Sequence, residues 1–540
     1  MSAIYLVNRH DYLLARSALG ERLAHTLLIT HAADVYHLML SEGLTQVHFV
    51  DAVPLDDGTL FHCHYEADRL ARAFDAELAE LRTRHLHAPL ATPGWDYLNI
   101  YFLALTTLRW RHFAPLLAAA LPPAPALAYF YLTNAQDYYF DSALQRQFLQ
   151  RALVQAGGRS LKEVHTQNHR PFLPDAMQFE LELDGVPGGA EALVHLPTVY
   201  YDYAAHQARL AQRHGDRLLD LHSPYFDIPI HDQRIGLRYT AAAPRPASLA
   251  EQAFSDAVRA RTTALFEVLD CDAALIPAQV ERQTSRSLSQ WRAFNQLCTA
   301  PALAGIGHLY LSDHDAGLSG PLAAWANLRG VATEIHPHSA LTISPFPVIA
   351  GALKHGYVRT PGAYLELGVG KSRWTAPLLA AAPPAPPAEP LVLLVFNALI
   401  DPGGVPTAPF QRIAEFTHDA LRVCQAARVR CKLRSKATWD FTLPLLQHLR
   451  ARGVEQAVLD DLFAHGPMGD WPARTSVYVG VDQISSALHQ FYAQGVPCIQ
   501  AYERGYSEPE LYVLPATGVH TTDYPGALRQ LQAMFPPLPN

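Results

Sequence analysis

The segment from Ser476 to Gln500 places the tightest limit on how this chain can fold. It reads Ser-Val-Tyr-Val-Gly-Val, then the polar stretch Asp-Gln-Ile-Ser-Ser, then Ala-Leu-His-Gln-Phe-Tyr-Ala, then Gln-Gly-Val-Pro-Cys-Ile-Gln. This order predicts a buried strand, a polar turn, a helix, a glycine turn and a second strand. A strand-helix-strand unit of this kind is typical of α/β proteins with a parallel sheet.

The same alternation extends over the chain after a proline-rich linker at 380–390, Ala-Ala-Ala-Pro-Pro-Ala-Pro-Pro-Ala-Glu-Pro. These prolines can neither continue a helix nor join a sheet ladder, and they favour an extended spacer. The continuous apolar run at 391–396 has the pattern of a parallel strand that is buried on both faces. Further strands are expected at 429–433, near 477 and at 497–501, and helices near 410–427, 443–452, 485 and 524–534.

The upstream part has a similar rhythm with longer insertions. The sequence predicts strands at 1–10, 128–132, 218–221, 307–312 and 330–336, and helices at 141–156 and 322–328. A chain of 540 residues also exceeds what one hydrophobic core usually supports. We therefore predict an α/β protein with two Rossmann-like, doubly wound parallel-sheet domains and a cleft between them. The predicted boundaries are 1–379 for the N-terminal domain, 380–390 for the linker and 391–540 for the C-terminal domain.

Composition excludes several classes of protein. A hydrophobic content of 49% with 17% charged residues is incompatible with a disordered chain, and a net charge of −8 argues against a nucleic-acid binder. The six cysteines are scattered without a CxxC pair, which is typical of reduced, buried thiols. Neither a signal peptide nor an apolar run of about 20 residues occurs. We expect a cytoplasmic protein, and attachment to the inner face of the membrane stays open.

Ser485 and Ser486 are expected in the first turn of a helix that follows a buried strand. Free backbone N–H groups, the positive end of the helix dipole and two small hydroxyls together suit a phosphate group. The competing interpretation is that these serines, together with Asp482, only cap the helix. Taken alone, the sequence favours neither interpretation.

These features resemble the GT-B glycosyltransferases. The resemblance covers residues 300–530 and rests on two Rossmann-type domains, a proline-rich crossing, and the segment Ser-Ser-Ala-Leu-His-Gln-Phe-Tyr-Ala-Gln-Gly-Val-Pro-Cys-Ile near the end. In that family the C-terminal domain binds the nucleotide sugar and the N-terminal domain holds much of the acceptor. The helix followed by Gly495-Val-Pro-Cys-Ile is similar to the segment that holds the donor phosphate.

A narrower resemblance is to bacterial transferases of Kdo, sialic acid and related ulosonic acids, which use CMP-activated donors. Several of these enzymes combine a Ser-Ser pair with an upstream basic or His-Pro motif. Here the basic loop reads Lys432-Leu-Arg-Ser-Lys-Ala-Thr-Trp-Asp, which departs from the Lys-x-His-Pro form of many sialyltransferases. Its cations suit a phosphate, and the alternative is a solvated basic turn. The predicted donor-binding residues are Lys432, Arg434, Lys436, Gln483, Ser485, Ser486 and Asn397.

Candidate catalytic groups follow two neighbouring upstream strands. Asp313-His-Asp315 follows the strand at 307–312, and His336-Pro-His338 ends the strand at 330–336. Chemistry is concentrated at the carboxyl ends of parallel strands. Asp313 or Asp315 could act as a base or as a nucleophile, and His336 or His338 could orient the carboxylate or bind the donor. The structural alternatives are that the aspartates cap the next helix and that His336 is an ordinary strand-end residue.

Other motifs give weaker signals. Tyr200, Tyr201 and Tyr203 are assigned a speculative role in holding a carbohydrate acceptor, whereas the aromatic stripe at 97–113 is expected to be core. Short-spaced histidine pairs occur without HExxH or clustered cysteines, so we predict no metal and no cofactor. The stretch Gly368-Val-Gly-Lys-Ser resembles the end of a Walker loop, but the first glycine of that motif is missing. We expect residues 362–374 to form a loop and a helix instead.

The sequence thus predicts a metal-independent glycosyltransferase of a bacterial type. Its expected partners are a nucleotide sugar, with a CMP-ulosonic acid favoured, and a glycan acceptor of a surface polysaccharide or glycoconjugate, with no nucleic acid. Two alternatives stay open. One is a UDP- or GDP-sugar transferase or an NDP-sugar 2-epimerase on the same fold, and the other is a noncatalytic scaffold that binds a glycan or a nucleotide.

Overall fold

The structure is a computed structural model of the 540-residue chain. It describes residues 3–538 except 52–53, 89–94, 123–125, 132–141, 158–159, 166–178, 184–187, 196–202, 223–233, 240–246, 313–317, 337–341, 344–357, 360–364, 369–370, 375–386, 398, 400–403, 436–439, 483–486 and 507–518. Most of the predicted linker lies outside these residues.

The first part of the chain forms a five-stranded parallel sheet with the order β3-β2-β1-β4-β5. Its strands are β1 (Ala3–Leu6), β2 (Leu28–Thr30), β3 (Val47–Phe49), β4 (Ala126–Tyr131) and β5 (Ser160–His165). The helices α1 (Arg9–Leu19) and α2 (Ala33–Ser41) and the short 3-10 helix η1 (Gly20–His25) connect the first three strands. The chain reverses its direction of winding between β1 and β4, which is the strand order of a Rossmann-type sheet.

The last part of the chain forms a second five-stranded parallel sheet with the order β17-β16-β18-β19-β20. Its strands are β16 (Leu391–Phe396), β17 (Arg430–Arg434), β18 (Val477–Val481), β19 (Cys498–Tyr502) and β20 (Val519–Asp523). The helices are α11 (Phe410–Ala426), α12 (Thr442–Ala451), α13 (Gln456–Asp460), α14 (Ala487–Ala493) and α15 (Tyr524–Met534), with the 3-10 turns η5 (Met468–Asp470) and η6 (Pro472–Arg474). This order is doubly wound, and winding reverses between β16 and β18.

The sequence of strand β16 explains why this sheet is covered on both faces. All six of its residues are buried. Val392 and Leu394 belong to the core that contains α11, whereas Leu391 and Leu393 belong to the core that contains α14. An uninterrupted apolar run can supply both faces in this way because successive side chains of a strand point to opposite sides.

A third, seven-stranded sheet lies between these two parts in the sequence, with the order β13-β11-β10-β7-β8-β9-β6. Its strands are β6 (Phe179–Glu182), β7 (Ala192–His195), β8 (Leu218–His222), β9 (Arg234–Tyr239), β10 (His308–Ser312), β11 (Ala332–His336) and β13 (Val358–Arg359). The β6–β9 pair is antiparallel. The helices α6 (Tyr203–His214) and α9 (Ser319–Arg329) and the 3-10 turn η2 (Gly215–Arg217) belong to the same region.

The strands β12 (Thr342–Ile343), β14 (Leu365–Gly368) and β15 (Lys371–Trp374) form a separate small sheet. Strands β14 and β15 are antiparallel, so the helix expected within 362–374 was wrong. The α/β class with parallel sheets is confirmed. The predicted N-terminal domain, however, contains both the first five-stranded sheet and the seven-stranded sheet, which the sequence pattern did not separate.

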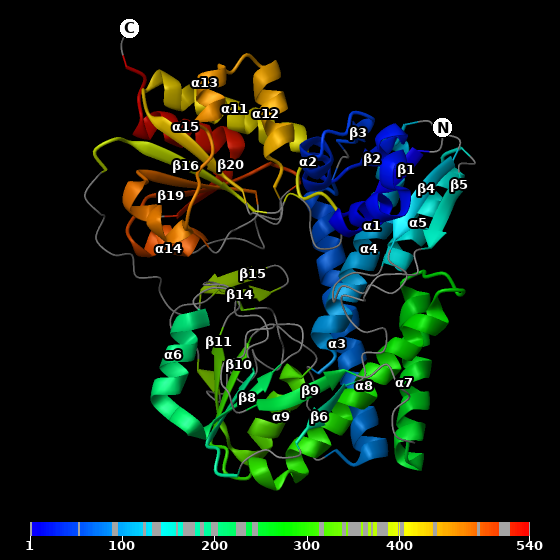
Figure 1. Cartoon of the computed structure of the whole chain (residues 1–540). Coiled ribbons are helices and arrows are strands. Elements are labelled where there is room, and N and C mark those ends of the chain that lie inside the picture. The colour runs from blue at the N-terminus through cyan, green and yellow to red at the C-terminus, as the bar shows by residue number, and fades with distance from the viewer. Residues whose placement is uncertain are drawn as a thin grey trace.

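Two long helices, α3 (Asp57–Leu86) and α4 (Tyr97–Ala120), run between the upper and lower parts of the molecule (Figure 1). The remaining helices of this region are α5 (Ser142–Gln155), α7 (Leu249–Val268) and α8 (Ile276–Thr299), followed by the 3-10 turn η3 (Pro301–Leu303). One end of the α3–α4 pair contributes Leu60 and Trp110 to the core under the first sheet. The other end contributes Ala71 and Ile100 to the core that includes α8. The pair therefore joins two hydrophobic cores.

The expectation that the aromatic stripe of α4 is core is confirmed, because Tyr101, Trp110 and Phe113 are all buried. A polar network reinforces the same helices where Arg82 of α3 meets Asp96 at the start of α4. Of the helices that the structure describes, none combines the length and the apolar character that a membrane span requires.

Candidate functional site

The carboxyl edges of the two five-stranded sheets face each other. His31 directly follows β2, and its Nε2 lies 2.7 Å from the carbonyl oxygen of Gly404, in the segment after β16. The backbone N–H of Asp57, beyond β3, donates to the carbonyl oxygen of Gly505, which follows β19, over 2.9 Å. Ligands of open α/β sheets bind outside the carboxyl ends of the strands. The facing edges therefore define the region in which to look for a site.

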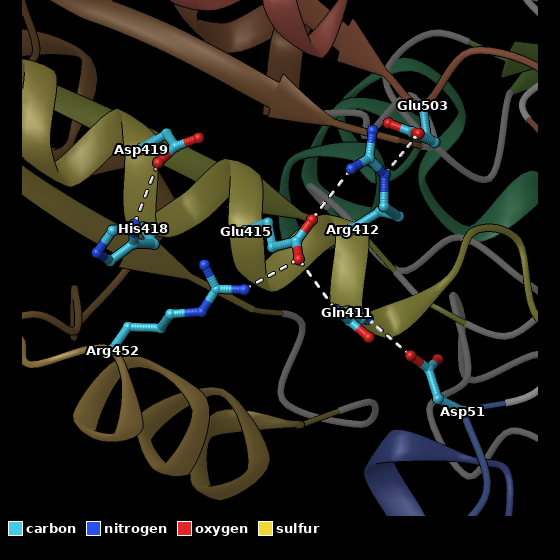
Figure 2. A network of polar contacts seen from close by, with 8 residues as sticks. All are labelled: Asp51, Gln411, Arg412, Glu415, His418, Asp419, Arg452 and Glu503. Atoms are coloured by element: carbon cyan, nitrogen blue, oxygen red, sulfur yellow. Dashed lines mark hydrogen bonds and ion pairs between the residues drawn. The ribbon is translucent and has the colours of Figure 1, made fainter.

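Asp51 caps a helix of the opposite sheet. It follows β3, and its two carboxylate oxygens accept hydrogen bonds from the backbone N–H groups of Phe410 (3.0 Å) and Gln411 (3.1 Å) at the start of α11. Figure 2 shows the Asp51 carboxylate directed at Gln411. The Phe49 and Phe410 rings pack edge to face beside this cap, with centroids 5.4 Å apart. A carboxylate at a helix N-terminus satisfies free N–H groups and the helix dipole.

Two further contacts extend this interface. The backbone N–H of Leu443 in α12 donates to Nδ1 of His37 in α2 over 3.1 Å. The other ring nitrogen of His37 lies 3.5 Å from a carboxylate oxygen of Asp440. Partial burial lowers the pKa of His37, and the neighbouring Asp440 opposes that shift. The start of α12, like that of α11, thus contacts a residue from the first part of the chain: His37 of α2 for α12 and Asp51 for α11.

His31 is buried within this interface, with 3% of its surface exposed. The hydroxyl of Tyr5 lies 2.6 Å from Nδ1, and Nε2 contacts the Gly404 carbonyl, which can only accept. The proton of the neutral ring must therefore be on Nε2, and Tyr5 donates to Nδ1. Burial lowers the pKa of His31 to about 4. The ring is neutral at pH 7, and protonating it would turn Nδ1 into a donor, so that the Tyr5 hydroxyl would have to accept from it.

His31 should make this protein sensitive to mild acid. Because the folded pKa of about 4 lies below the ordinary 6.5, the unfolded chain binds a proton first, and stability is lost as pH falls from 6.5 to 4. We expect the stability of the wild type, relative to His31→Gln, to fall by about 2.5 kcal/mol between pH 7 and pH 4.5. Chemical denaturation at both values measures this. A difference that does not change with pH would show that His31 is not the titrating group.

Figure 2 shows a charged network beside the Asp51 cap. Arg412 of α11 donates from Nε to Glu503, at the end of β19, over 2.9 Å and from Nη1 to Glu415 over 3.0 Å. Arg452 also donates to Glu415, over 3.0 Å, and His418 contacts Asp419. Glu503 is paired with Arg412, and Glu415 is paired with both Arg412 and Arg452. This network therefore joins α11, α12 and the end of β19, and it neutralises both carboxylates.

Arg434 differs from these arginines. It is the last residue of β17 and pairs in register with Val395 of β16, next to the point where the winding of the sheet reverses. Its Nη1 is buried and has no hydrogen-bond partner in the described structure. Desolvation lowers the pKa of the guanidinium, and among the described residues no carboxylate opposes that shift. A partly desolvated cation that has no counterion in the described part of the chain is a candidate site for an anion.

Lys432, two residues earlier on the same strand, is already engaged. Its Nζ lies 2.6 Å from a carboxylate oxygen of Asp461 and also contacts the carbonyl oxygen of that residue. The hydrogen bond from Lys432 lowers the pKa of Asp461. Lys432 therefore serves the packing of β17 in this structure, and of the predicted basic residues that are described, only Arg434 has an unsatisfied group.

The remaining donor candidates cluster around the same switch point in the chain. Asn397 directly follows β16 and is half-buried. Asp482 directly follows β18 with a left-handed backbone at φ 64°. Gln483, Ser485 and Ser486 come next but lie outside the described residues, as does Lys436. Helix α14 is described from Ala487, and the predicted hydroxyl site can be placed only by its position between Asp482 and that helix.

The candidates from the seven-stranded sheet are placed only in part. Asp313, Asp315 and His338 lie outside the described residues, as do Tyr200 and Tyr201. His336 is the last residue of β11 and is paired in register with Ser312, which precedes the two aspartates. Tyr203 is the first residue of α6, and the side chains of His336 and Tyr203 are outside what is described.

Two buried polar residues were missed by sequence reasoning. His195 ends β7 beside Leu311 of β10, is fully buried, and contacts the carbonyl oxygen of Leu221 through Nδ1 at 2.9 Å. Asp11 lies in the first turn of α1 and accepts a hydrogen bond from the backbone N–H of Val7 over 3.1 Å. The available signal for His195 was a polar residue that ends an apolar strand, but neither residue belongs to a recognisable motif.

No cluster of His, Cys, Asp or Glu suited to a metal ion occurs within the described ranges. The chain matches no protein-family model and no curated protein sequence.

Proposed function

We propose that this protein is a metal-independent glycosyltransferase of the GT-B fold. It would transfer a sugar from a nucleotide donor, with a CMP-activated ulosonic acid such as Kdo or a sialic-acid relative favoured, to a glycan acceptor. Two parallel sheets with Rossmann-type strand orders and facing carboxyl edges support this proposal. Nucleotide sites in such sheets lie at the point where the strand order reverses.

Arg434 is the observation that carries the proposal. Its guanidinium has a buried, unsatisfied Nη1 at the carboxyl end of β17, adjacent to the switch strand β16. A phosphate would provide both the missing acceptor and the missing negative charge. In this role Arg434 would act with Ser485 and Ser486 on the donor phosphate, and Asn397 and Gln483 would complete the site.

The transfer step follows from this assignment. An acceptor hydroxyl oxygen attacks the anomeric carbon, the bond from that carbon to the phosphate oxygen breaks, and the nucleotide leaves with the electron pair. Asp313 or Asp315 takes the hydroxyl proton, or attacks first as a nucleophile, with His336 or His338 orienting it. Arg434 stabilises the negative charge on the departing phosphate, which is the role that a metal ion has in other transferases.

Calorimetric titration with CMP, UDP and GDP tests the proposal. We expect the wild type to bind CMP and Arg434→Met to bind it about 10- to 100-fold more weakly, because one charge-assisted contact is lost. Arg430→Met is the matched control: Arg430 lies on the same strand, is exposed, and pairs with Glu389 at 3.2 Å. It should change the dissociation constant less than threefold.

Each other result has a definite meaning. Preference for UDP or GDP would keep the fold assignment and change the donor. Failure of the wild type to bind any of the three nucleotides would overturn the proposal. If binding persists in Arg434→Met but is lost in Ser485→Ala/Ser486→Ala, the serines bind the phosphate and Arg434 does not.

A further inference from the structure

One row of paired residues crosses the C-terminal sheet just below its carboxyl edge. Arg434 pairs with Val395, Val395 with Gly480, and Gly480 with Gln500. Since side chains alternate along a strand and paired residues share a face, this whole row lies on one side of the sheet. It is the side of α14, because Leu393 and Tyr478, two residues earlier on their strands, pack in the core that contains α14.

Gln500 extends across its neighbour in this row. A Cβ atom at position 480 would overlap Oε1 of Gln500 and lie 3.1 Å from its Cδ. The Gln500 amide therefore occupies the space that a side chain at position 480 would need. Gly480 is required here because it leaves room for this amide, and its φ is not in the left-handed region.

The amide is directed at the turn after β18. Nε2 of Gln500 donates to the carbonyl oxygen of Asp482 over 2.9 Å. The backbone N–H of Asp482 donates to the carbonyl oxygen of Ala501 over 2.8 Å. The N–H and the carbonyl group of Asp482 are thus both bonded to residues of β19. The backbone of Asp482 has a φ of 64°, which is unfavourable for residues other than glycine.

The oxygen of the Gln500 amide, unlike its nitrogen, makes no hydrogen bond in the described structure. Gln500 is only 2% exposed, and its Oε1 has no hydrogen-bond partner in the described structure. A buried acceptor without a partner is destabilising, and an apolar side chain of the same size would avoid this penalty. The contact that distinguishes glutamine from such a side chain here is its hydrogen bond to Asp482.

We propose that Gln500 is a positioning residue that fixes the backbone of Asp482, the residue at which the chain leaves β18. The functional consequence rests on the proposed nucleotide site, because Gln483, Ser485 and Ser486 follow this turn. Gln500 does not contact the donor in this scheme. It acts through Asp482, and Gly480 makes the contact possible.

Gln500→Met tests the proposal, because methionine keeps the volume and loses the donor. We expect the affinity for CMP to fall about tenfold, as for the loss of one positioning hydrogen bond. The thermal midpoint should stay equal or rise, because the unpaired buried oxygen is removed as well. Amide hydrogen exchange in a peptide covering residues 482–493 should become faster. Gln494→Met, an exposed glutamine after α14, should change none of these quantities.

A second pair of variants separates positioning from packing. Gly480→Ala should displace the Gln500 amide and lower both the thermal midpoint and the affinity for CMP. In Gly480→Ala/Gln500→Ala the new methyl group fits the vacated space, so the thermal midpoint should recover while the affinity stays low. Recovery of both quantities together would overturn the proposal, because packing alone would then explain the effect.

The two proposals can fail separately. Wild-type affinity and unchanged exchange in Gln500→Met would overturn the positioning role, while CMP binding by the wild type would leave the proposed function intact. If the wild type binds none of CMP, UDP and GDP, the proposed function is wrong. Faster exchange in Gln500→Met would then still support the positioning of the turn, and unchanged exchange would overturn it.

Discussion

Asp11→Asn should raise the free energy of unfolding by about 5 kcal/mol at pH 9 and change it little at pH 4. Asp11 is 2% exposed, and burial raises the pKa of its carboxyl to about 8, against the hydrogen bonds from the backbone of Val7 and Asn8. An aspartate with a raised folded pKa stabilises the fold while it is protonated. That stability is lost as pH rises from the unfolded value near 3.8 to about 8.

The Asn variant removes this titration without removing the contact. Its amide oxygen can still accept the hydrogen bond from Val7, so the difference from the wild type should grow by about 1.4 kcal/mol per pH unit between pH 4 and pH 8 and then level off. Urea denaturation across pH 4–9 measures it. Glu21→Gln, at an exposed position, is the control and should stay within about 0.5 kcal/mol of the wild type. A constant difference across this range would mean that Asp11 is ionised in the folded protein.

Arg82→Met should destabilise the protein by about 3–5 kcal/mol, because it leaves the buried Asp96 carboxylate without its cation. Arg82 is 2% exposed and Asp96 is fully buried. The same carboxylate accepts hydrogen bonds from Gln283 (3.0 Å) and Ser287 (3.1 Å) of α8. The guanidinium also lies 4.4 Å from the centre of the Trp95 ring. This single pair therefore joins α3, α4 and α8.

A double variant separates the charge from the packing. In Arg82→Met/Asp96→Asn no unpaired charge is buried, so we expect at least half of the lost stability to return in chemical denaturation. Arg84→Met, an exposed arginine on the same helix, should have an effect within about 0.5 kcal/mol. If the double variant is less stable than Arg82→Met, the hydrogen bonds of Asp96 matter more than its charge.

The sequence predicts the C-terminal sheet well, because its signals are local. The apolar run of β16 is buried at all six positions, and the helices expected at 410–427 and 524–534 are α11 and α15. Strand order is a different matter. It depends on contacts between distant segments, so the pattern could not show that the upstream strands form two large sheets.

The same distinction applies to the candidate site. Lys432 and Arg434 are equivalent in the sequence, two positions apart on one strand, and only the position of Asp461 shows that the lysine is paired. Asp51 carries no motif, and its role depends on the start of a helix far along the chain. Gln500 and Gly480 belong to one strand-helix-strand unit, yet their contact requires the register of β18 and β19.

The cap on α11 also has a consequence for synthesis on the ribosome. Asp51 precedes Phe410 by 359 positions, and at about 5–20 residues per second roughly 20–70 s separate their translation. During that time the first sheet can fold, but Phe49 and Ala33, which later pack into the core of the last domain, stay uncovered. The nascent chain thus exposes an apolar surface beside unpaired polar groups, which is the kind of surface that a chaperone binds.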